Sequence, residues 1–243
     1  VLSDIQANRE ALAAVLDAIG GFAIDRLVLL GDLVGYGPDP AYVVDWAVHA
    51  CGEGAVCIRG NHADAASTGN LSGMSENARD ALRWTIERLS AKQRDFLGTM
   101  PMSCEEGDVL YTHAGAWRPA AWPYVRDIPD ARRALEAQGA RIAVCGHTHV
   151  PAVFYGRPNG AVSSFAPVAN KPAPLFASCR SIIVVGAVGQ PRDGNPAACV
   201  GLLDTDARTV TMLRVPYDWD CTARKIVAAG LPGWLGMRLG IGR

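Results

Sequence analysis

The chain has 243 residues, of which 49% are hydrophobic and 19% are charged, and its formal net charge is −1 at pH 7. This length allows a sizeable buried core. The near-neutral charge argues against duplex nucleic acid and an anionic membrane as partners, because both attract strongly basic surfaces. No apolar run is long enough to span a bilayer.

The cysteines favour a reducing compartment. There are seven, none in a C-x-x-C pair, and Cys57, Cys145 and Cys199 lie in apolar runs where a small core residue fits. We therefore expect free thiols instead of a disulfide framework, and a cytoplasmic location. Only three residues precede Asp4 and none is an initiator Met, so we also expect the full protein to have residues before Val1.

The first part of the chain alternates expected strands and helices. Apolar runs at 1–3, 26–30 and 55–58 predict short buried strands, and helices are expected at 9–19, after the N-cap Asn8, and at 42–50. This β-α-β-α-β order favours a parallel sheet with right-handed crossovers.

Helices are again expected beyond a polar loop that runs to Gly73. Ser75 is a candidate N-cap for a helix to Leu89, and Ser90 for a helix that stops before Pro101. Gln93 stands three residues after Ser90, which is the capping-box spacing.

Strands dominate the later part of the chain. Pro158-Asn159-Gly160 predicts a hairpin turn, and residues 165–178 look irregular. The other elements expected here are strands ending at Thr112 and Cys145, a helix at 129–138, strands at 181–185, 199–203 and 209–215, and a helical segment at 222–239. We expect a single domain over 1–243, with a β/α first half (1–150), a mostly β second half (151–215) and a C-terminal helical segment (216–243).

Polar ligand-type residues follow the apolar runs. Taken singly, each would pass for a turn residue, a helix cap or part of a polar loop. Together they predict one site, because ligands bind at the carboxyl ends of strands in open α/β sheets. Imidazole and carboxylate groups suit transition metals. The candidate ligands are Asp4, Asp32, Asn61, His113, His147 and His149.

Six candidate ligands are more than one ion requires. They suit two ions that share the carboxylate of Asp32, since two-metal hydrolases hold their ions roughly 3.5–4 Å apart. Mixed nitrogen and oxygen ligands fit Mn, Fe, Co, Ni or Zn. His62, next to Asn61, would stay off the metal and protonate a leaving group.

Five blocks carry a family resemblance: Ser3-Asp4-Ile5-Gln6, Gly31-Asp32-Leu33-Val34-Gly35, Gly60-Asn61-His62, Thr112-His113 and Gly146-His147-Thr148-His149. In order and spacing they resemble the D-x-H, GD-x-x-G, GNH, H and GH-x-H motifs of the calcineurin-like metallophosphoesterase superfamily. Gly189 to Gly194 resembles, more loosely, a loop of a bacterial phosphoesterase subgroup.

The resemblance implies an α/β fold, namely a four-layer α/β/β/α sandwich of two mixed sheets with the metal site at the carboxyl ends of the strands. It also implies a dinuclear metal centre and metal-dependent hydrolysis of phosphate esters by a metal-bridging hydroxide, with Asp32 and His62 as catalytic residues. Phosphodiesterase and phosphomonoesterase activities both remain open, as do dinucleoside polyphosphates and phosphoproteins as substrates. By motif position, Asp4, Asp32 and His149 match the first metal site, and Asp32, Asn61, His113 and His147 match the second.

Two departures from the family pattern matter. Gln6 stands where the family has a histidine ligand, and a Gln oxygen is either a weaker ligand or no ligand. An alternative function is therefore a weakly active or inactive protein that binds metal or a phosphate ligand. Asp64 stands one place later than the acid that usually follows GNH, so it orients His62 from a shifted place or the role is lost.

Three further residues are candidates for substrate contact: Tyr36, Arg118 and Arg192. Arg192 either clamps a phosphate or is an ordinary surface arginine. Trp117, Trp122 and Tyr124 either stack on a ring of the substrate or pack a long loop, and packing is our preference. A nucleic-acid phosphodiesterase is a third hypothesis, against which the near-neutral charge counts.

Overall fold

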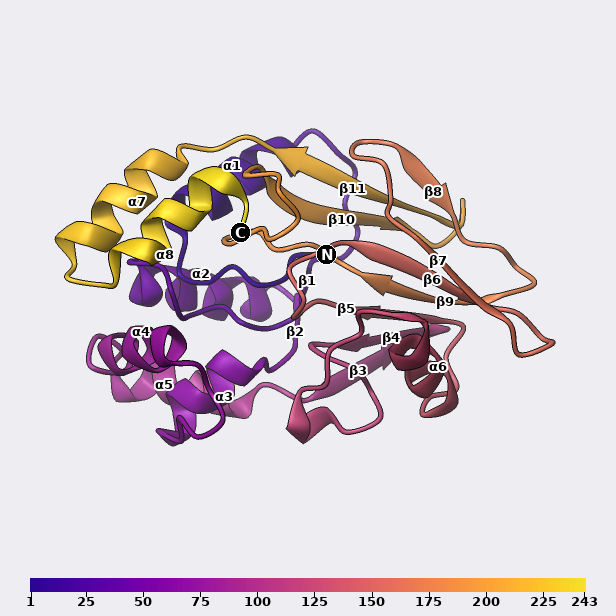
Figure 1. Ribbon diagram of the computed structural model, residues 1–243, viewed down its shortest axis with the longest axis horizontal. Helices are drawn as coiled ribbons and strands as arrows, with labels where there is room; N and C mark the ends of the chain where they lie inside the picture. Colours follow the sequence, from indigo (N-terminus) through magenta and orange to yellow (C-terminus); the bar gives the residue numbers. More distant parts are fainter.

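The computed structural model describes every residue from Val1 to Arg243 and has an α/β fold with mixed sheets (Figure 1). The larger sheet has six strands in the order β3-β4-β5-β9-β6-β7. Its centre, β4-β5-β9, is parallel, and the other pairings are antiparallel. The strands are β3 (Ser103–Glu106), β4 (Val109–Thr112), β5 (Ile142–Cys145), β6 (Ala152–Gly156), β7 (Val162–Phe165) and β9 (Arg180–Val184).

The N-terminal residues join two smaller ladders. Leu2 forms a parallel bridge with Leu29, in the pair β1 (Val28–Leu29) and β2 (Val56–Cys57). On its other side, Val1 exchanges two backbone hydrogen bonds with Gly201. Gly201 belongs to the antiparallel group β10 (Ala198–Asp204), β11 (Thr209–Val215) and β8 (Pro172–Pro174). The first residues therefore connect the strands that carry Asp4 and Asp32 to the C-terminal strands.

The three larger of four apolar cores hold the layers together. One contains side chains from both groups of strands, such as Val28, Val144 and Val210. A second packs helices against the N-terminal and C-terminal strands, and a third covers the larger sheet with α6. The helices are α1 (Arg9–Ile19), α2 (Pro40–Gly52), α3 (Asn61–Thr68), α4 (Glu76–Ile86), α5 (Ala91–Thr99) and α6 (Ile128–Glu136).

The sequence predicted the three helix starts that carry side-chain caps. Asn8, Ser75 and Ser90 cap α1, α4 and α5 through their side-chain oxygens, and Gln93 completes the capping box with Ser90. The hairpin of β6 and β7 around Asn159 is also confirmed. These features depend on local hydrogen bonding, which a short sequence pattern determines.

Two segments that we expected to be loops are regular. Residues after Asn61 form α3, whose alanines Ala63, Ala65 and Ala66 are buried against the helical core. The segment 165–178 contains β8, an edge strand on β11 in which two prolines are tolerated. We did not predict α3 because its segment is rich in polar residues, and we did not predict β8 because its segment is rich in proline.

The C-terminal segment is broken into α7 (Trp219–Ala228), α8 (Gly233–Met237) and the 3-10 turn η2 (Arg238–Ile241). Helix α7 lies beside α1, and α8 packs near α4 (Figure 1). Across the whole structure, we find no helix with the length and apolar character that crossing a bilayer requires.

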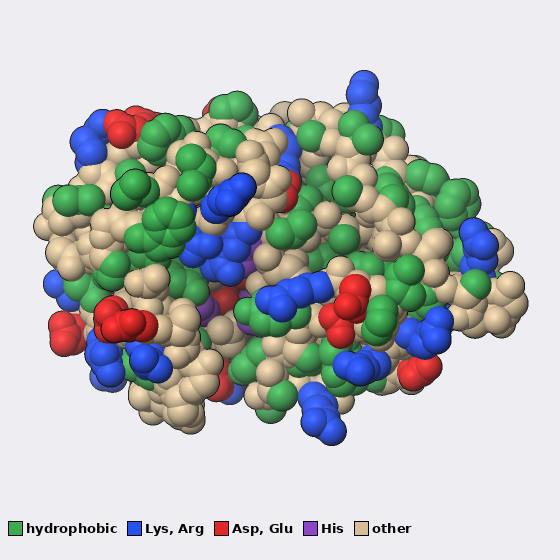
Figure 2. All heavy atoms as spheres, in the orientation of Figure 1, with side chains coloured by type: hydrophobic (Ala, Val, Ile, Leu, Met, Phe, Trp, Pro, Cys, Tyr) green, Lys and Arg blue, Asp and Glu red, His purple; other side chains and the backbone are tan.

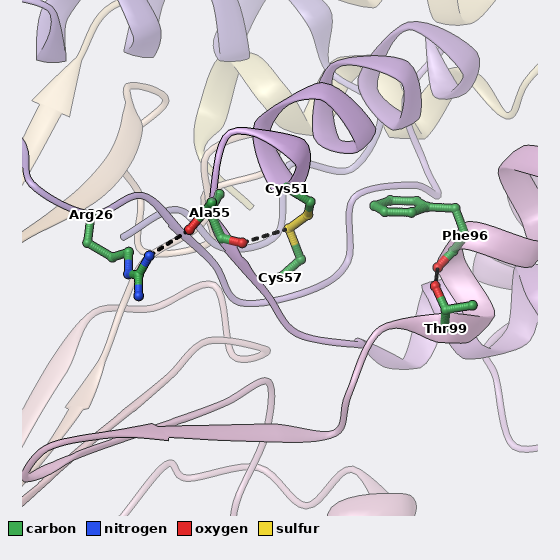
Figure 3. Close-up of a disulfide and its surroundings, with 7 residues drawn as sticks. Arg26, Cys51, Ala55, Cys57, Phe96 and Thr99 are labelled. Atoms are coloured by element: carbon green, nitrogen blue, oxygen red, sulfur yellow. Dashed lines mark hydrogen bonds between the residues drawn. A yellow bond between two sulfur atoms is a disulfide. The ribbon is translucent and has the colours of Figure 1, made fainter.

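One cysteine prediction was wrong. Cys57 is disulfide-bonded to Cys51, in addition to packing in the helical core (Figure 3). The bond ties the end of α2 to β2, and the chain then runs directly to Asn61. Spacing did not indicate this pair, because the two cysteines are brought together by the turn between α2 and β2. Cys104, Cys145, Cys179, Cys199 and Cys221 are free.

Asn8 is expected to contribute more to stability than an ordinary cap. Its Oδ1 accepts from Ala11 N at 3.0 Å, and its Nδ2 donates to Gly189 O at 2.8 Å, all in a buried setting. Asn8→Ala should lower the free energy of unfolding by about 2–3 kcal/mol, since it loses a cap and leaves a buried carbonyl unpaired. Urea denaturation measures this, with Ser90→Ala as a solvent-exposed cap control expected to cost about 1 kcal/mol. Equal losses for the two variants would contradict the prediction.

Candidate metal centre

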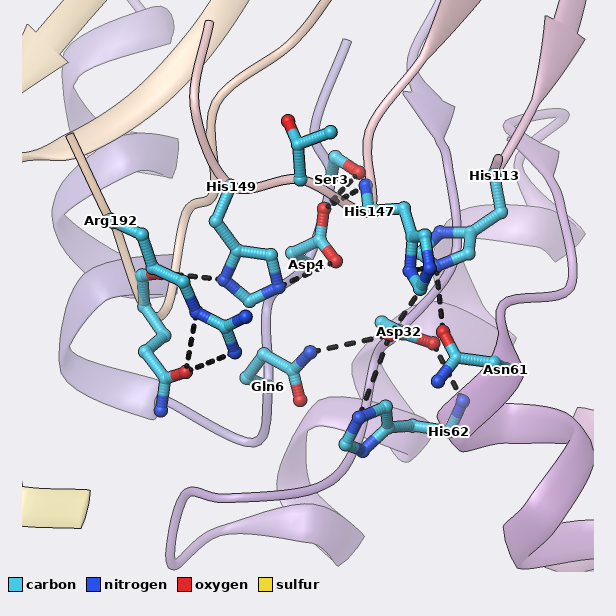
Figure 4. A network of polar contacts seen from close by, with 12 residues as sticks. Ser3, Asp4, Gln6, Asp32, Asn61, His62, His113, His147, His149 and Arg192 are labelled. Carbon is cyan, nitrogen blue, oxygen red and sulfur yellow. Dashed lines mark hydrogen bonds and ion pairs between the residues drawn. The ribbon is translucent and has the colours of Figure 1, made fainter. Parts of the chain in front are cut away.

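The residues predicted from the ends of the apolar runs meet in one place (Figure 4). His113 directly follows β4, and His147 and His149 lie on the turn after β5. Asn61 and His62 begin α3, just beyond β2. Asp4 and Asp32 follow the two segments that Leu2 and Leu29 bridge. The carboxyl ends of neighbouring parallel strands explain this convergence.

Four hydrogen-bond acceptors face one another around His113. Its Nδ1 donates to the Leu30 carbonyl at 2.7 Å, so in the neutral ring Nε2 carries a lone pair. That Nε2 lies 3.1 Å from Asn61 Oδ1, 3.1 Å from His147 Nδ1 and 3.4 Å from Asp32 Oδ2. The lone pairs of these atoms repel one another unless a cation or a proton lies between them.

The electrostatics of the cluster point the same way. Burial alone would lower the pKa of His113, but the charges of Asp32 and Asp4 and the hydrogen bonds to Asp32 and Leu30 raise it to about 9. Burial and the neighbouring His113 lower the pKa of His147 to about 3. In the absence of a cation, a proton on His113 is thus held beside a neutral His147. Asp32, His113 and His147 offer the nitrogen and oxygen donors that a transition-metal ion takes, so the residues present fit a metal.

The two oxygens of Asp32 have different partners. Oδ1 accepts from the backbone N of His62 at 2.8 Å, which leaves Oδ2 facing His113 and Gln6. Burial would raise the pKa of Asp32, but His113 and His62 outweigh it and lower the pKa to about 2. The carboxylate is therefore charged, and Oδ2 is the oxygen available to more than one ion.

Asp4 and His149 form a second group. Asp4 Oδ2 accepts from Ser3 Oγ at 2.6 Å and from His147 N at 3.0 Å. Its Oδ1 has no hydrogen-bond donor and lies 3.1 Å from His149 Nε2. The His149 Nδ1 donates to the Gln190 carbonyl at 2.6 Å, which directs Nε2 to the site. Burial would raise the pKa of Asp4, but the nearby histidines and Ser3 hold it well below its usual range.

Gln6 lies beside this second group without completing it. Its Nε2 donates to Asp32 Oδ2 at 3.4 Å, and its buried Oε1 has no partner. If the Gln6 amide were flipped, Oε1 would take the place of Nε2 and face the Asp32 carboxylate. Two facing oxygens would then need a cation between them. Asp4, His149 and Gln6 thus offer fewer strong ligands than the group around His113.

His62 stands apart from both groups, with its Nε2 3.9 Å from Asp32 Oδ2. Its Nδ1 is buried without a partner, and burial lowers its pKa. The ring packs against Tyr36, with centroids 4.7 Å apart. Asp64 does not orient it, because that carboxylate faces Arg59 at 3.3 Å.

The backbone at these positions is unusual. Asp4, Gln6, Asp32, His147 and His149 have φ values of 53°, 52°, 47°, 67° and 60°, in the left-handed region that non-glycine residues rarely occupy. Such conformations cluster at functional sites and persist where the surroundings enforce them. Close approach enforces them here: a Cβ at Gly60 would collide with the Asp32 carboxylate, and one at Gly146 with the Ser3 hydroxyl.

A cleft of about 650 Å³ opens above the candidate ligands. Tyr36 and Arg192 line it, as do Trp122 and Tyr124, whereas Arg118 is exposed and is not among the lining residues. Trp117 packs with the α6 core instead.

Two contributors lie outside the predicted ligand pattern, although stacking or loop packing was expected of Tyr124 and Gln190 lies in the Gly189 loop. Tyr124 stacks on His147, with ring centroids 4.1 Å apart, and carries Arg126 near its ring at 3.6 Å. Gln190 is buried and holds His149 through its carbonyl and Arg192 through its side chain. Both residues position other side chains and are not candidate ligands themselves, so the spacing of ligand-type residues does not predict their roles.

Comparison with known proteins identifies relatives over the full chain. Residues 1–208 match the model of the calcineurin-like phosphoesterase superfamily domain. An uncharacterized protein of Methanocaldococcus jannaschii is 33% identical over 249 residues, covering 100% of this chain and 97% of the relative. The crystal structure of a metallophosphoesterase from Sphaerobacter thermophilus superposes with a TM-score of 0.87 at 35% identity, covering 100% and 97%. A hypothetical protein from Pyrococcus horikoshii OT3 shares the fold, with a TM-score of 0.75 at 17% identity over the same shares.

Metal should stabilise the protein through the His113 group. A ligand that binds only the folded state adds about 2.7 kcal/mol at a hundred times its dissociation constant. Thermal denaturation of chelated, desalted protein should therefore shift upward when Mn²⁺ is added. His147→Ala should abolish most of the shift, while His49→Ala, at an exposed histidine outside the site, should retain it. The same shift in both variants would rule out this cluster as the binding site.

Proposed function

Because the chain belongs to the calcineurin-like phosphoesterase superfamily, we propose that the His113 group is the metal centre with which it hydrolyses small phosphate esters. Family membership makes the protein a metallophosphoesterase and implies a phosphoester as substrate in general. The observation that carries the proposal for this chain is the meeting of Asn61 Oδ1, His147 Nδ1 and Asp32 Oδ2 at 3.1–3.4 Å from His113 Nε2, while the other ring nitrogen of His113 faces the Leu30 carbonyl.

We propose two divalent ions. Asp32, Asn61, His113 and His147 would hold one, and Asp4, Asp32 and His149 the other, with Gln6 as a weak additional ligand. The donors suit Mn, Fe, Co, Ni or Zn. When bound, such ions supply an activated water for attack on phosphorus and neutralise charge on the phosphate. The packing of two facing groups of strands between helices supports a four-layer α/β/β/α arrangement.

The residues around the ions have separate roles in this proposal. His62 lies at the cleft beside Asp32 and would give a proton to the leaving oxygen once a phosphate anion has raised its pKa. Arg192 would hold a phosphate oxygen through its guanidinium, which Gln190 Oε1 orients by two hydrogen bonds of 3.2 and 2.7 Å. Tyr36 would keep the His62 ring in place.

The setting of the protein is part of the proposal. The net charge of −1 supports a small ester or a phosphorylated group over duplex nucleic acid as the substrate. Five of the seven cysteines are free, which supports a cytoplasmic location, whereas the Cys51–Cys57 disulfide counts against it.

Turnover of nitrophenyl esters tests the function. Chelated protein reloaded with Mn²⁺, Zn²⁺, Co²⁺, Ni²⁺ or Mg²⁺ should hydrolyse a nitrophenyl monoester or a bis-nitrophenyl diester, and the preferred ester decides between phosphomonoesterase and phosphodiesterase. Asn61→Ala and His62→Ala should each lower kcat by about a hundredfold or more, the usual contribution of a positioned acid or a metal-site residue. His49→Ala should leave kcat unchanged.

The alternative function rests on Gln6. If no metal supports turnover while elemental analysis finds bound metal, the protein is a metal- or phosphate-binding protein, and the hydrolase proposal fails for this chain.

Gln6→His tests the second ion directly. An imidazole at this position should raise metal affinity at the Asp4 and His149 group by about tenfold or more, because it adds a stronger ligand than an amide oxygen. Titration with Co²⁺, followed by visible absorption, separates the two binding steps. Only the weaker step should change, and Gln6→Glu serves as a charge-adding comparison. Unchanged affinity in the histidine variant would show that position 6 does not reach an ion.

A further inference from the structure

The cleft above the candidate ligands is larger than a phosphate group needs. Its volume of about 650 Å³ lies in the range of sites that hold a small organic ligand. Figure 2 shows the hollow, with His and acidic side chains visible inside it and hydrophobic, Lys and Arg side chains around it. Space beside the candidate ligands is therefore available to the group that the phosphate esterifies.

Two loops supply cleft-lining residues that are not candidate ligands. One follows the 3-10 turn η1 (Pro119–Ala121) and carries Trp122 and Tyr124. The other joins α3 to α4 and carries Asn70 and Met74. Met74 is half-buried and packs against the helical core, whereas Asn70 is exposed. The cleft thus has aromatic rings on one loop, and an apolar and a polar side chain on the other.

Trp122 is not part of an apolar core. Trp46, Trp84 and Trp117 each pack against one of the four cores. Trp122 belongs to none of them, and its ring is partly exposed in the cleft. The packing role that we preferred from the sequence therefore describes Trp117 but not Trp122.

The Trp122 ring lies beside His113 and keeps a free face. The two ring centroids are 5.8 Å apart with the planes at 72°, an edge-to-face contact that occupies at most one face of the indole. Tyr124 differs, because His147 stacks on it at 4.1 Å and the Arg126 guanidinium carbon lies 3.6 Å from its ring centre. Two groups so close to one ring centre occupy its two faces. Trp122 is therefore the aromatic residue of this loop that has a face to offer a ligand.

The backbone holds Trp122 in place. Its φ of 51° lies in the left-handed region, which is an outlier for so bulky a side chain. Its amide donates to the Pro119 carbonyl at 3.1 Å, and Gly115 N donates to the Pro123 carbonyl at 2.8 Å. The second bond ties the loop to the segment just after His113. Strained residues held by their surroundings cluster at ligand sites, and a ring that is fixed before binding loses little entropy when a ligand arrives.

We infer that Trp122 is a stacking platform for a planar ring carried by the substrate, and that the preferred substrates are phosphate esters of ring-bearing groups. An indole face binds an aryl ring or a nucleobase through the same stacking contact. Because Trp122 adjoins His113, the ring would lie next to the phosphate that the metal centre holds. The substrate class rests on the proposed hydrolase function, but the ring-binding platform does not.

Phosphonates test the platform without turnover, because a phosphoesterase does not break their C–P bond. Protein loaded with Mn²⁺, with its metal content checked by elemental analysis, is titrated in a calorimeter with phenylphosphonate and with methylphosphonate. The wild type should bind the phenyl compound about tenfold more tightly, which is in the range for one stacked ring. Trp122→Ala should remove this advantage and change the affinity for methylphosphonate much less.

Two further variants keep the result interpretable. Trp122→Phe retains a ring and should keep part of the advantage. Trp234→Ala removes a tryptophan that is 45% exposed on α8 and does not line the cleft, so it should bind both phosphonates like the wild type. Equal binding of the two phosphonates by the wild type, binding of neither, or an unchanged advantage in Trp122→Ala would overturn the inference. An equal loss for both phosphonates in Trp122→Ala would also overturn it, because Trp122 would then support the metal centre and not a ring.

Ester substrates show which kind of ring the platform prefers. Phenyl phosphate is compared with methyl phosphate, and adenosine 5′-monophosphate with ribose 5-phosphate, each as the monoester or as its methyl diester, whichever form the nitrophenyl test selects. The ring-bearing ester of each pair should have the lower KM, and the pair with the larger ratio identifies the ring as an aryl group or a nucleobase. Trp122→Ala should remove these ratios with a much smaller effect on kcat.

Two outcomes separate the substrate class from the hydrolase proposal. Equal KM values within both pairs in the wild type would contradict the substrate class. Absence of turnover with every ester, nitrophenyl esters included, would contradict the hydrolase proposal and leave the phosphonate result standing.

Discussion

The arrangement of this site depends on buried lone pairs that face one another. Three atoms lie 3.1–3.4 Å from His113 Nε2: His147 Nδ1, Asn61 Oδ1 and Asp32 Oδ2. The neutral His113 ring has one N–H, and this N–H donates from Nδ1 to the Leu30 carbonyl, so Nε2 has no hydrogen to donate to the three atoms. Such an arrangement is costly in a buried setting unless positive charge lies at its centre. The same logic applies to Asp4 Oδ1 and His149 Nε2, where the Gln190 carbonyl takes the other ring proton. A cation is the simplest group that satisfies all of these atoms together.

The rest of the fold holds this constraint in place. Parallel pairing of β4 with β5 and of β1 with β2 brings successive strand ends to one edge, and left-handed backbone turns at Asp32, His147 and His149 then aim the side chains inward. Asn8 ties the start of α1 to the backbone of Gly189, one residue before Gln190. The C-terminal helices reach the same region through Tyr36. Elements from both ends of the chain therefore stabilise a site whose candidate ligands come mostly from the first 150 residues.

The sequence predicted those parts of the structure that depend on local pattern. The caps at Asn8, Ser75 and Ser90 and the strand 142–145 required only neighbouring residues, and the ligand candidates followed from polar residues after apolar runs. Helix α3 was missed because its buried face consists of small alanines between polar residues. The Cys51–Cys57 bond and the stacking of Tyr124 on His147 depend on packing between separate elements. Residue spacing within one segment does not predict contacts between separate elements. Gln190 acts mainly through hydrogen bonds to His149 and Arg192, and its residue type alone does not predict these bonds.

The central claim is that a cation belongs among His113, His147, Asp32 and Asn61. A crystal of the protein grown with Mn²⁺ and measured at the manganese absorption edge tests it most directly. The account predicts an anomalous peak within ligand distance of His113 Nε2, His147 Nδ1, Asp32 Oδ2 and Asn61 Oδ1, with a weaker or absent peak between Asp4 and His149. A fully occupied manganese site elsewhere, with His113 still hydrogen-bonded to His147 and no density between them, would contradict it.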